Sequence, residues 1–296
     1  MDGLPPEWHE TIRLLGPPLT AALVLPGLLV YYGLHILERG IIFIDLALAQ
    51  VATIGTCVCI LLGHEATDIH AYAWSVGFTI VGALLFTVLR EPRHGRVRLE
   101  ALIGIVYVVA AAVSILLLSR APHGREELQK TLVGDLLTVS WPAVTQTMAL
   151  YALLGLIHWI WRRQFLRLTF DREGRWTGVD RQIWDFGFYV MFGLVVTTFV
   201  HLGGVLLVFS YLIIPAVCGR LWSASVTGAL GIGWVVALTG GLGGLVMSYQ
   251  LDVPGGAAVI CVLGGLLVLC AGAACWPRPQ LQRRREDRLT QGSSAR

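Results

Sequence analysis

Three side chains that can bind a metal ion lie close together near the start of the chain. His35 and Glu38 are three residues apart, and Asp45 follows about two helical turns later. An imidazole and two carboxylates could form a nitrogen and oxygen site of the kind that suits zinc or manganese. The alternative is an ordinary ion pair, in which Arg39 neutralises Asp45 or Glu38. The residues alone leave both interpretations open.

A second group of candidate ligands follows a short distance downstream. It consists of His64, Glu65, Asp68 and His70, directly after Gly63. The order is similar to H-E-x-x-H, the zinc-protease pattern, but Asp68 occupies the second histidine position. Proteolysis is therefore disfavoured. The group predicts either a mouth that attracts or hands over cations or an ordinary polar loop.

The sequence carries no motif for binding ATP. A phosphate-binding loop reads G-x-x-x-x-G-K-[ST], and the single lysine, Lys130, lacks these neighbours. If ATP drives this protein, another chain must hydrolyse it, and a segment of this chain must receive the movement. The candidate receiver is the polar stretch 162–182, which mixes arginine, acidic and aromatic residues. Its alternative interpretation is a solvated loop.

The composition indicates the environment in which these residues must be positioned. The 296 residues are 55% hydrophobic and only 14% charged, with a mean hydropathy of +0.70. Soluble domains contain about 25% charged residues. The net charge of +3 is too small to suggest a nucleic-acid partner. We therefore expect an all-α, polytopic membrane protein.

Uncharged runs of about 20 residues predict the membrane spans. The run from 186 to 218 covers 33 residues, which is too long for one crossing, and Gly203 and Gly204 offer a break within it. We expect one full helix followed by a short or tilted one there, which gives nine segments, or eight if the run forms a single span. The predicted spans are 14–37, 41–63, 72–89, 101–118, 143–161, the two parts of 186–218, 224–247 and 254–275.

The placement of arginine predicts the orientation of this bundle. With the amino terminus outside and the carboxyl terminus inside, 18 of the 22 basic residues face the cytoplasm, as the positive-inside rule requires. Residues 1–13 then form an extracytoplasmic segment, and residues 14–276 form a single membrane domain. The basic tail, 277–296, is cytoplasmic and could lie on anionic lipid.

Six segments resemble the permease subunits of bacterial metal-ion ABC transporters, the ABC-3 family of zinc, manganese and iron uptake. They occur in the family's order and together cover most of the chain. They are LERGIIFIDLALAQVATIGTCVCILLG from Leu37, EALIGIVYVVAAAVSILLL, LVGDLLTVSWPAV, RRQFLRLTFDREG, GVLLVFSYLIIPAV and SYQLDVPGGAAVICVLGGLL.

The resemblance implies a helical bundle of the type II ABC-importer kind and several partners. A second permease copy would complete a central path, an ATPase would dock below it, and an extracytoplasmic metal-binding protein would deliver from above. The family's coupling segment to the ATPase matches Phe170, Asp171, Arg172 and Glu173. The divalent metal is the transported substrate, and no permanently bound cofactor is implied.

The sequence departs from the family at the start of the second span. Many members read G-D-A-L-S-H there, which places an aspartate and a histidine on one helix face. The matching positions here are Leu46 and Gln50. We therefore expect any metal path to use His35, Glu38, Asp45 and Gln50 instead, and the sequence does not indicate which metal is carried.

The main alternative is a self-sufficient secondary transporter driven by protons or sodium ions. Such carriers usually hold carboxylates deep within their spans. The predicted spans after residue 101 contain no acidic residue, and Asp45 lies near a span end. The pattern favours a transport subunit, itself not an enzyme, that is coupled to a separate ATPase.

Overall fold

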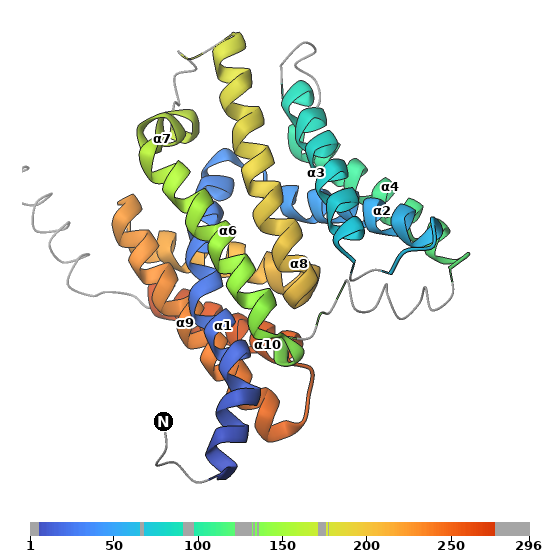
Figure 1. Ribbon diagram of the computed structural model, residues 1–296. Helices are drawn as coiled ribbons and strands as arrows, with labels where there is room; N and C mark the ends of the chain where they lie inside the picture. Colours follow the sequence, from blue (N-terminus) through green and yellow to red (C-terminus); the bar gives the residue numbers. More distant parts are fainter. Residues whose placement is uncertain are drawn as a thin grey trace, which may run out of the picture.

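The computed structural model describes residues 6–65, 68–90, 98–121, 136–170 and 178–275, together with 132, 134 and 176. Within these ranges the chain is helical and forms no strand, so the all-α expectation is confirmed (Figure 1). The elements are α1 (Pro6–Arg39), α2 (Ile44–Leu61), α3 (Ile69–Leu89), α4 (Leu99–Leu118), the short 3-10 helix η1 (Leu136–Thr138), α6 (Trp141–Ile160), α7 (Arg162–Phe170), α8 (Val179–Trp222), α9 (Val226–Leu251) and α10 (Gly255–Cys275).

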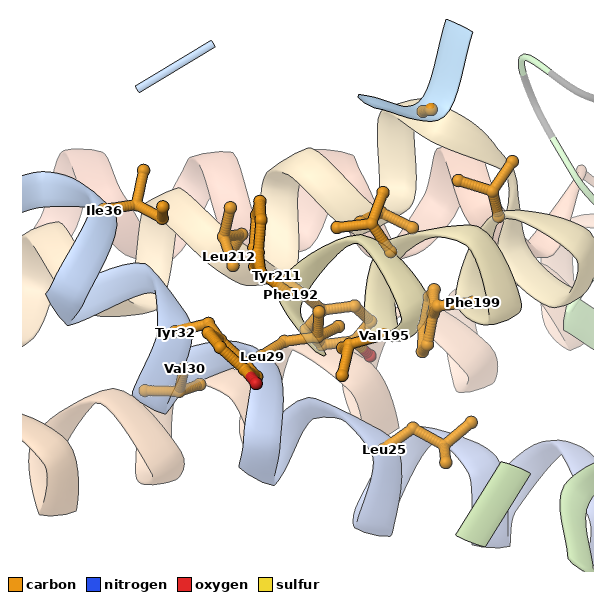
Figure 2. Packing of buried hydrophobic residues seen from close by; sticks show 14 of the residues in the cluster. Leu25, Leu29, Val30, Tyr32, Ile36, Phe192, Val195, Phe199, Tyr211 and Leu212 are labelled. Atoms are coloured by element: carbon orange, nitrogen blue, oxygen red, sulfur yellow. The ribbon is translucent and has the colours of Figure 1, made fainter. Parts of the chain in front are cut away.

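Helices α1 and α8 form the centre of the bundle. Figure 2 shows side chains from both helices pointing into a common layer, among them Tyr32 of α1 and Phe192 and Tyr211 of α8. A Cβ on Gly33 would collide with the carbonyl oxygen of Leu212, so the two backbones touch directly. Close approach of this kind lets helices pack tightly where lipid provides no hydrophobic drive.

Helix α8 is bent at Gly204, where the sequence predicts a break. Gly204 has φ 77° and ψ 162°, a backbone conformation that is essentially restricted to glycine. In the first leg Asp185 bonds Arg39, and in the second leg Arg220 pairs with Glu38. Because Glu38 and Arg39 are neighbours at the end of α1, both ends of α8 lie at that end of the bundle. The predicted break is confirmed, and the two legs run in opposite directions.

The remaining helices surround this centre in two groups. Helices α2, α3 and α4 pack together on one side, and α9 and α10 pack together on the other (Figure 1). In α9, added Cβ atoms on Gly240 and Gly244 would collide with Leu263 and Val259 of α10. The short helix α7 lies beside α1 and α8 at the end where α1 finishes.

Eight helices in the described ranges are long and apolar enough to cross a membrane. This number counts α8 once, and its two legs account for the ninth predicted segment. Helix α8 begins at Val179, before the predicted run at 186, because a helix continues through charged residues wherever they find partners. The side of the membrane on which each end lies stays a prediction, as do the domain boundaries.

Candidate functional site

His35 lies in the last turns of α1 and is held by α7. Its side chain is buried, and Nδ1 lies 2.6 Å from Oγ1 of Thr169. The ring also packs edge-on against Tyr31, with a centroid distance of 4.6 Å. His35 therefore links two helices, and its Nδ1 is engaged with a hydroxyl group.

Glu38 is paired with an arginine from the far end of α8. It forms an ion pair with Arg220, whose Nη1 also donates to the backbone oxygen of Ala224 at 2.8 Å. The alternative of an ion pair is therefore found, but the partner is Arg220 and not Arg39. The carboxylate of Glu38 thus ties the end of α1 to the end of α8.

Asp45 is a predicted path residue whose carboxylate has no hydrogen-bond partner in the described part of the chain. It lies in the first turn of α2 and is only 1% exposed, and neither carboxylate oxygen has a hydrogen-bond partner among the described residues. The ion pair with Arg39 does not form, because Arg39 bonds Asp185 instead. Burial of an unpaired charge is costly, so this carboxylate calls for a proton or a cation.

Gln50 is also buried in α2, five residues beyond Asp45. Five residues correspond to about 140° around a helix, so the two side chains do not share a face. In the described part of the chain, no three histidine, cysteine, aspartate or glutamate side chains gather closely enough to hold a metal ion. A single chain therefore does not assemble His35, Glu38, Asp45 and Gln50 into one site.

The second predicted group is partly assembled between α2 and α3. His64 Nδ1 lies 3.9 Å from Oδ2 of Asp68, and the rings of His64 and His70 have a centroid distance of 4.9 Å. Glu65 is exposed next to them, and its backbone oxygen accepts the N–H of Asp68. These four residues form an exposed polar cluster, as both a cation mouth and an ordinary loop would require.

The predicted coupling stretch contains a helix that hydropathy does not indicate. In α7, Phe165 and Leu168 are buried while Arg162 and Arg167 are exposed, an amphipathic spacing that is the available sequence signal. Phe170 is its last residue and lies near His35, with ring centroids 6.4 Å apart. Asp171, Arg172 and Glu173 lie outside the described residues.

Sequence reasoning missed Asp185, which is buried in the first leg of α8 and is 4% exposed. Its Oδ1 bonds Arg39 at 3.1 Å and also bonds Arg90, the residue that follows α3, and its Oδ2 lies 3.7 Å from Arg181. The expectation that no acidic residue occurs in the later spans is therefore wrong for α8 as the structure has it. Asp185 differs from the carboxylates of ion-coupled carriers because three arginines neutralise it.

Comparison with known proteins places these residues in a family. Residues 12–273 match the model of a family described as the ABC 3 transport family. A probable metal transport system membrane protein of Chlamydia pneumoniae is 27% identical over 191 residues, which cover 62% of this chain and 64% of that protein. The match thus spans slightly less than two thirds of that relative.

Two further matches extend over more of the chain. The manganese transport system membrane protein MntC of Halalkalibacterium halodurans is 23% identical over 253 residues, covering 85% of this chain and 84% of that protein. A chain in the structure of PsaBC from Streptococcus pneumoniae in complex with Fab has a TM-score of 0.72 at 21% identity and covers 89% of this chain and 94% of that chain. This structural likeness shows that the fold is shared.

Proposed function

Because this chain belongs to the ABC 3 transport family, we propose that it is the membrane-spanning permease subunit of an ATP-driven importer of divalent transition metal ions. The observation that carries the proposal is the family match, which takes in nearly the whole helical bundle. The protein is then a multi-pass protein of the bacterial plasma membrane. A separate ATPase hydrolyses ATP, and this chain forms the translocation path.

The proposed partners follow from this role. An ATPase binds the end of the bundle that carries α7, and an extracytoplasmic metal-binding protein delivers the ion to the opposite end. A second copy of the permease completes the path. The H. halodurans relative is named as the membrane protein of a manganese transport system, which supports an assembly of several chains.

The proposed cargo is manganese or zinc. Asp45 is the candidate ligand best supported within the path, because its buried carboxylate has no partner in the described chain. His35 and Glu38 are engaged with Thr169 and Arg220, so they serve the path only if those contacts open. The exposed cluster at His64 supports a mouth that collects cations.

One observation favours the secondary transporter as a second candidate. The same buried and unpartnered Asp45 could bind a proton that is exchanged during transport. Asp185 is the other carboxylate that is buried in the described part of the chain, and its arginine partners neutralise it, so it is not a candidate for this role. The two candidates differ in what they need, since the carrier requires no ATPase.

Reconstitution in liposomes tests the proposal. The chain is purified with its ATPase, placed in liposomes, and supplied with its metal-binding protein. These liposomes should accumulate radioactive manganese or zinc only when ATP is supplied. Metal movement under a pH gradient by the chain without the ATPase would establish the secondary transporter instead.

A variant of Asp45 tests the path. The replacement Asp45→Asn should raise the metal concentration needed for half-maximal uptake about tenfold, because a metal ligand loses its charge. The control is Asp180→Asn, which changes an exposed carboxylate on α8. Equal uptake by both variants would remove Asp45 from the path.

A further inference from the structure

Two adjacent residues end α7, and each of them contacts a different arginine, Arg39 for Thr169 and Arg220 for Phe170. Thr169 Oγ1 accepts a hydrogen bond from Arg39 Nε at 3.1 Å and lies 2.6 Å from His35 Nδ1. Since the oxygen accepts from Arg39, the hydroxyl hydrogen is available for His35. One hydroxyl group therefore joins α7 to two side chains of α1.

Arg39 extends this contact to two more helices. Its side chain is 1% exposed, its Nη1 donates to Asp185 Oδ1 at 3.1 Å, and its guanidinium lies 3.8 Å from the centroid of the Phe188 ring. Asp185 also binds Arg90, at the end of α3. The hydroxyl of Thr169 is thus connected through Arg39 to the first leg of α8 and to α3.

Phe170 makes the corresponding contact with the second leg of α8. The guanidinium of Arg220 lies 5.8 Å from the centroid of its ring, and Arg220 pairs with Glu38 of α1. Arg220 also donates to the oxygen of Ala224, in the turn between α8 and α9. Neighbouring residues of α7 therefore reach opposite ends of the folded-back helix.

The body of α7 is anchored firmly enough to move as one piece with these contacts. Phe165 is buried and stacks on His158 of α6, with a centroid distance of 4.1 Å and an interplanar angle of 19°. Its edge meets Trp184 of α8 at 5.4 Å. Because close-packed protein interiors transmit strain, we expect a push on α7 to reach α6 and α8 through these contacts.

We propose that Thr169 and Phe170 form a two-armed clamp, through which a displacement of α7 is passed to both legs of α8. The Thr169 arm acts through Arg39 and Asp185, and the Phe170 arm acts through Arg220. This inference rests on the proposed function, in which an ATPase displaces the stretch 162–182. In the Thr169 arm, hydrogen bonds to charged groups are strong and directional, which suits them to pass on such a displacement. In the Phe170 arm, the guanidinium of Arg220 is attracted to the face of the ring.

The decisive variant is Thr169→Val, which keeps the shape of the side chain and removes its hydroxyl group. The matched control is Thr87→Val on α3, because Thr87 is buried and its hydroxyl donates within its own helix, to the backbone oxygen of Ala83. Thr169→Ser restores the hydroxyl and should rescue the first variant. Each variant is studied as the full complex with its ATPase in liposomes, with the metal-binding protein added.

Two quantities are measured, the number of metal ions imported per ATP hydrolysed and the hydrogen exchange of α7, α1 and α8. We expect Thr169→Val to lower the number of ions per ATP about tenfold, as the loss of a hydrogen bond to a charged group suggests. ATP hydrolysis and the amount of bound ATPase should stay unchanged. Exchange should rise at the end of α1 and at the start of α8 as well as in α7.

The outcomes separate the clamp from the proposed function. An unchanged ion-to-ATP ratio together with unchanged exchange in α1 and α8 overturns the clamp, as does failure of Thr169→Ser to rescue. If the wild-type complex imports no metal, the proposed function fails. The hydrogen-exchange measurement then still tests the clamp. Faster exchange that spreads from α7 to α1 and α8 then supports the clamp, while faster exchange confined to α7 overturns it.

Discussion

The two ends of the bundle are held together by different chemistry. At the end where α1 finishes, the buried side chains of Asp185 and Arg39 form a charged cluster with the partly exposed Arg90, and this cluster joins α8, α1 and the end of α3. At the end where α8 bends, backbone meets backbone, because a Cβ on Gly134 would collide with Gly203. Charged residues at this second end, such as Asp68, are exposed.

This difference indicates which end is suited to change its arrangement. Buried charges can exchange partners when a neighbouring segment moves, and each exchange keeps them neutralised. A contact between glycine backbones has no such alternative partner and holds the bend in place. We therefore expect the charged end to respond to the ATPase and the glycine end to act as the fixed corner of α8.

The largest effect should come from Asp185→Asn at the charged end. It leaves Arg39 buried without its counter-charge, which should lower the free energy of unfolding by about 3–5 kcal/mol. Thermal unfolding of the purified protein in lipid nanodiscs measures the loss. The control Asp180→Asn alters an exposed carboxylate of the same helix and should change little. Equal stability of the two variants would show that the charged cluster contributes nothing to holding this end.

The next effect should come from Gly204→Ala at the bend. Its φ of 77° and ψ of 162° are strained for any residue with a Cβ, so stability should fall by about 1–3 kcal/mol. Gly187→Ala is the matched control in α8, because its added Cβ would meet no neighbour. That control should be neutral or stabilising by up to about 1 kcal/mol. If Gly204→Ala unfolds at the wild-type temperature, the bend is not a fixed corner.

A smaller effect is expected for the pair of Glu38 and Arg220. Both side chains are about one fifth exposed, at 20% and 18%, so water screens part of their attraction. A double-mutant cycle with Glu38→Gln and Arg220→Gln should give a coupling energy of about 1 kcal/mol. A coupling energy as large as the whole cost of Asp185→Asn would contradict the view that the buried cluster dominates this end.

The smallest effect on stability is expected for the exposed histidines at the opposite end. His64→Ala and His70→Ala should change the free energy of unfolding by no more than about 0.5 kcal/mol. Under the proposed function, the double variant should nevertheless slow metal uptake at low metal concentration. A marked loss of stability would show instead that the cluster holds α2 and α3 together.

Much of the fold could be predicted from local features of the chain. The apolar runs are long enough to require helices, since backbone polar groups in lipid must bond within their own segment. The two glycines at 203 and 204 indicated the bend, because helix geometry limits how far one segment can run between membrane surfaces. Helix α7 was missed, since its amphipathic spacing is short and its charges dominate the hydropathy.

The candidate site was predicted less well. The three predicted ligands that are close in the sequence do not meet one another. His35 contacts Thr169, Glu38 pairs with Arg220, and the carboxylate of Asp45 has no hydrogen-bond partner among the described residues. Closeness in sequence did not predict their partners, since Thr169 and Arg220 belong to α7 and α8. Asp185 was overlooked for the same reason, because nothing near it in the sequence shows that Arg39 would neutralise it.

The sequence by itself determined that the chain is a helical membrane protein, where most of its spans lie and which residues depart from the family pattern. Hydropathy and glycine conformation are local properties, and they act before any helix meets another. Only the tertiary structure decided that Arg39 bonds Asp185 and that Asp45 stays unpaired. Such pairings depend on which helices pack together, and for Asp185 and Arg39 the two partners are 146 residues apart.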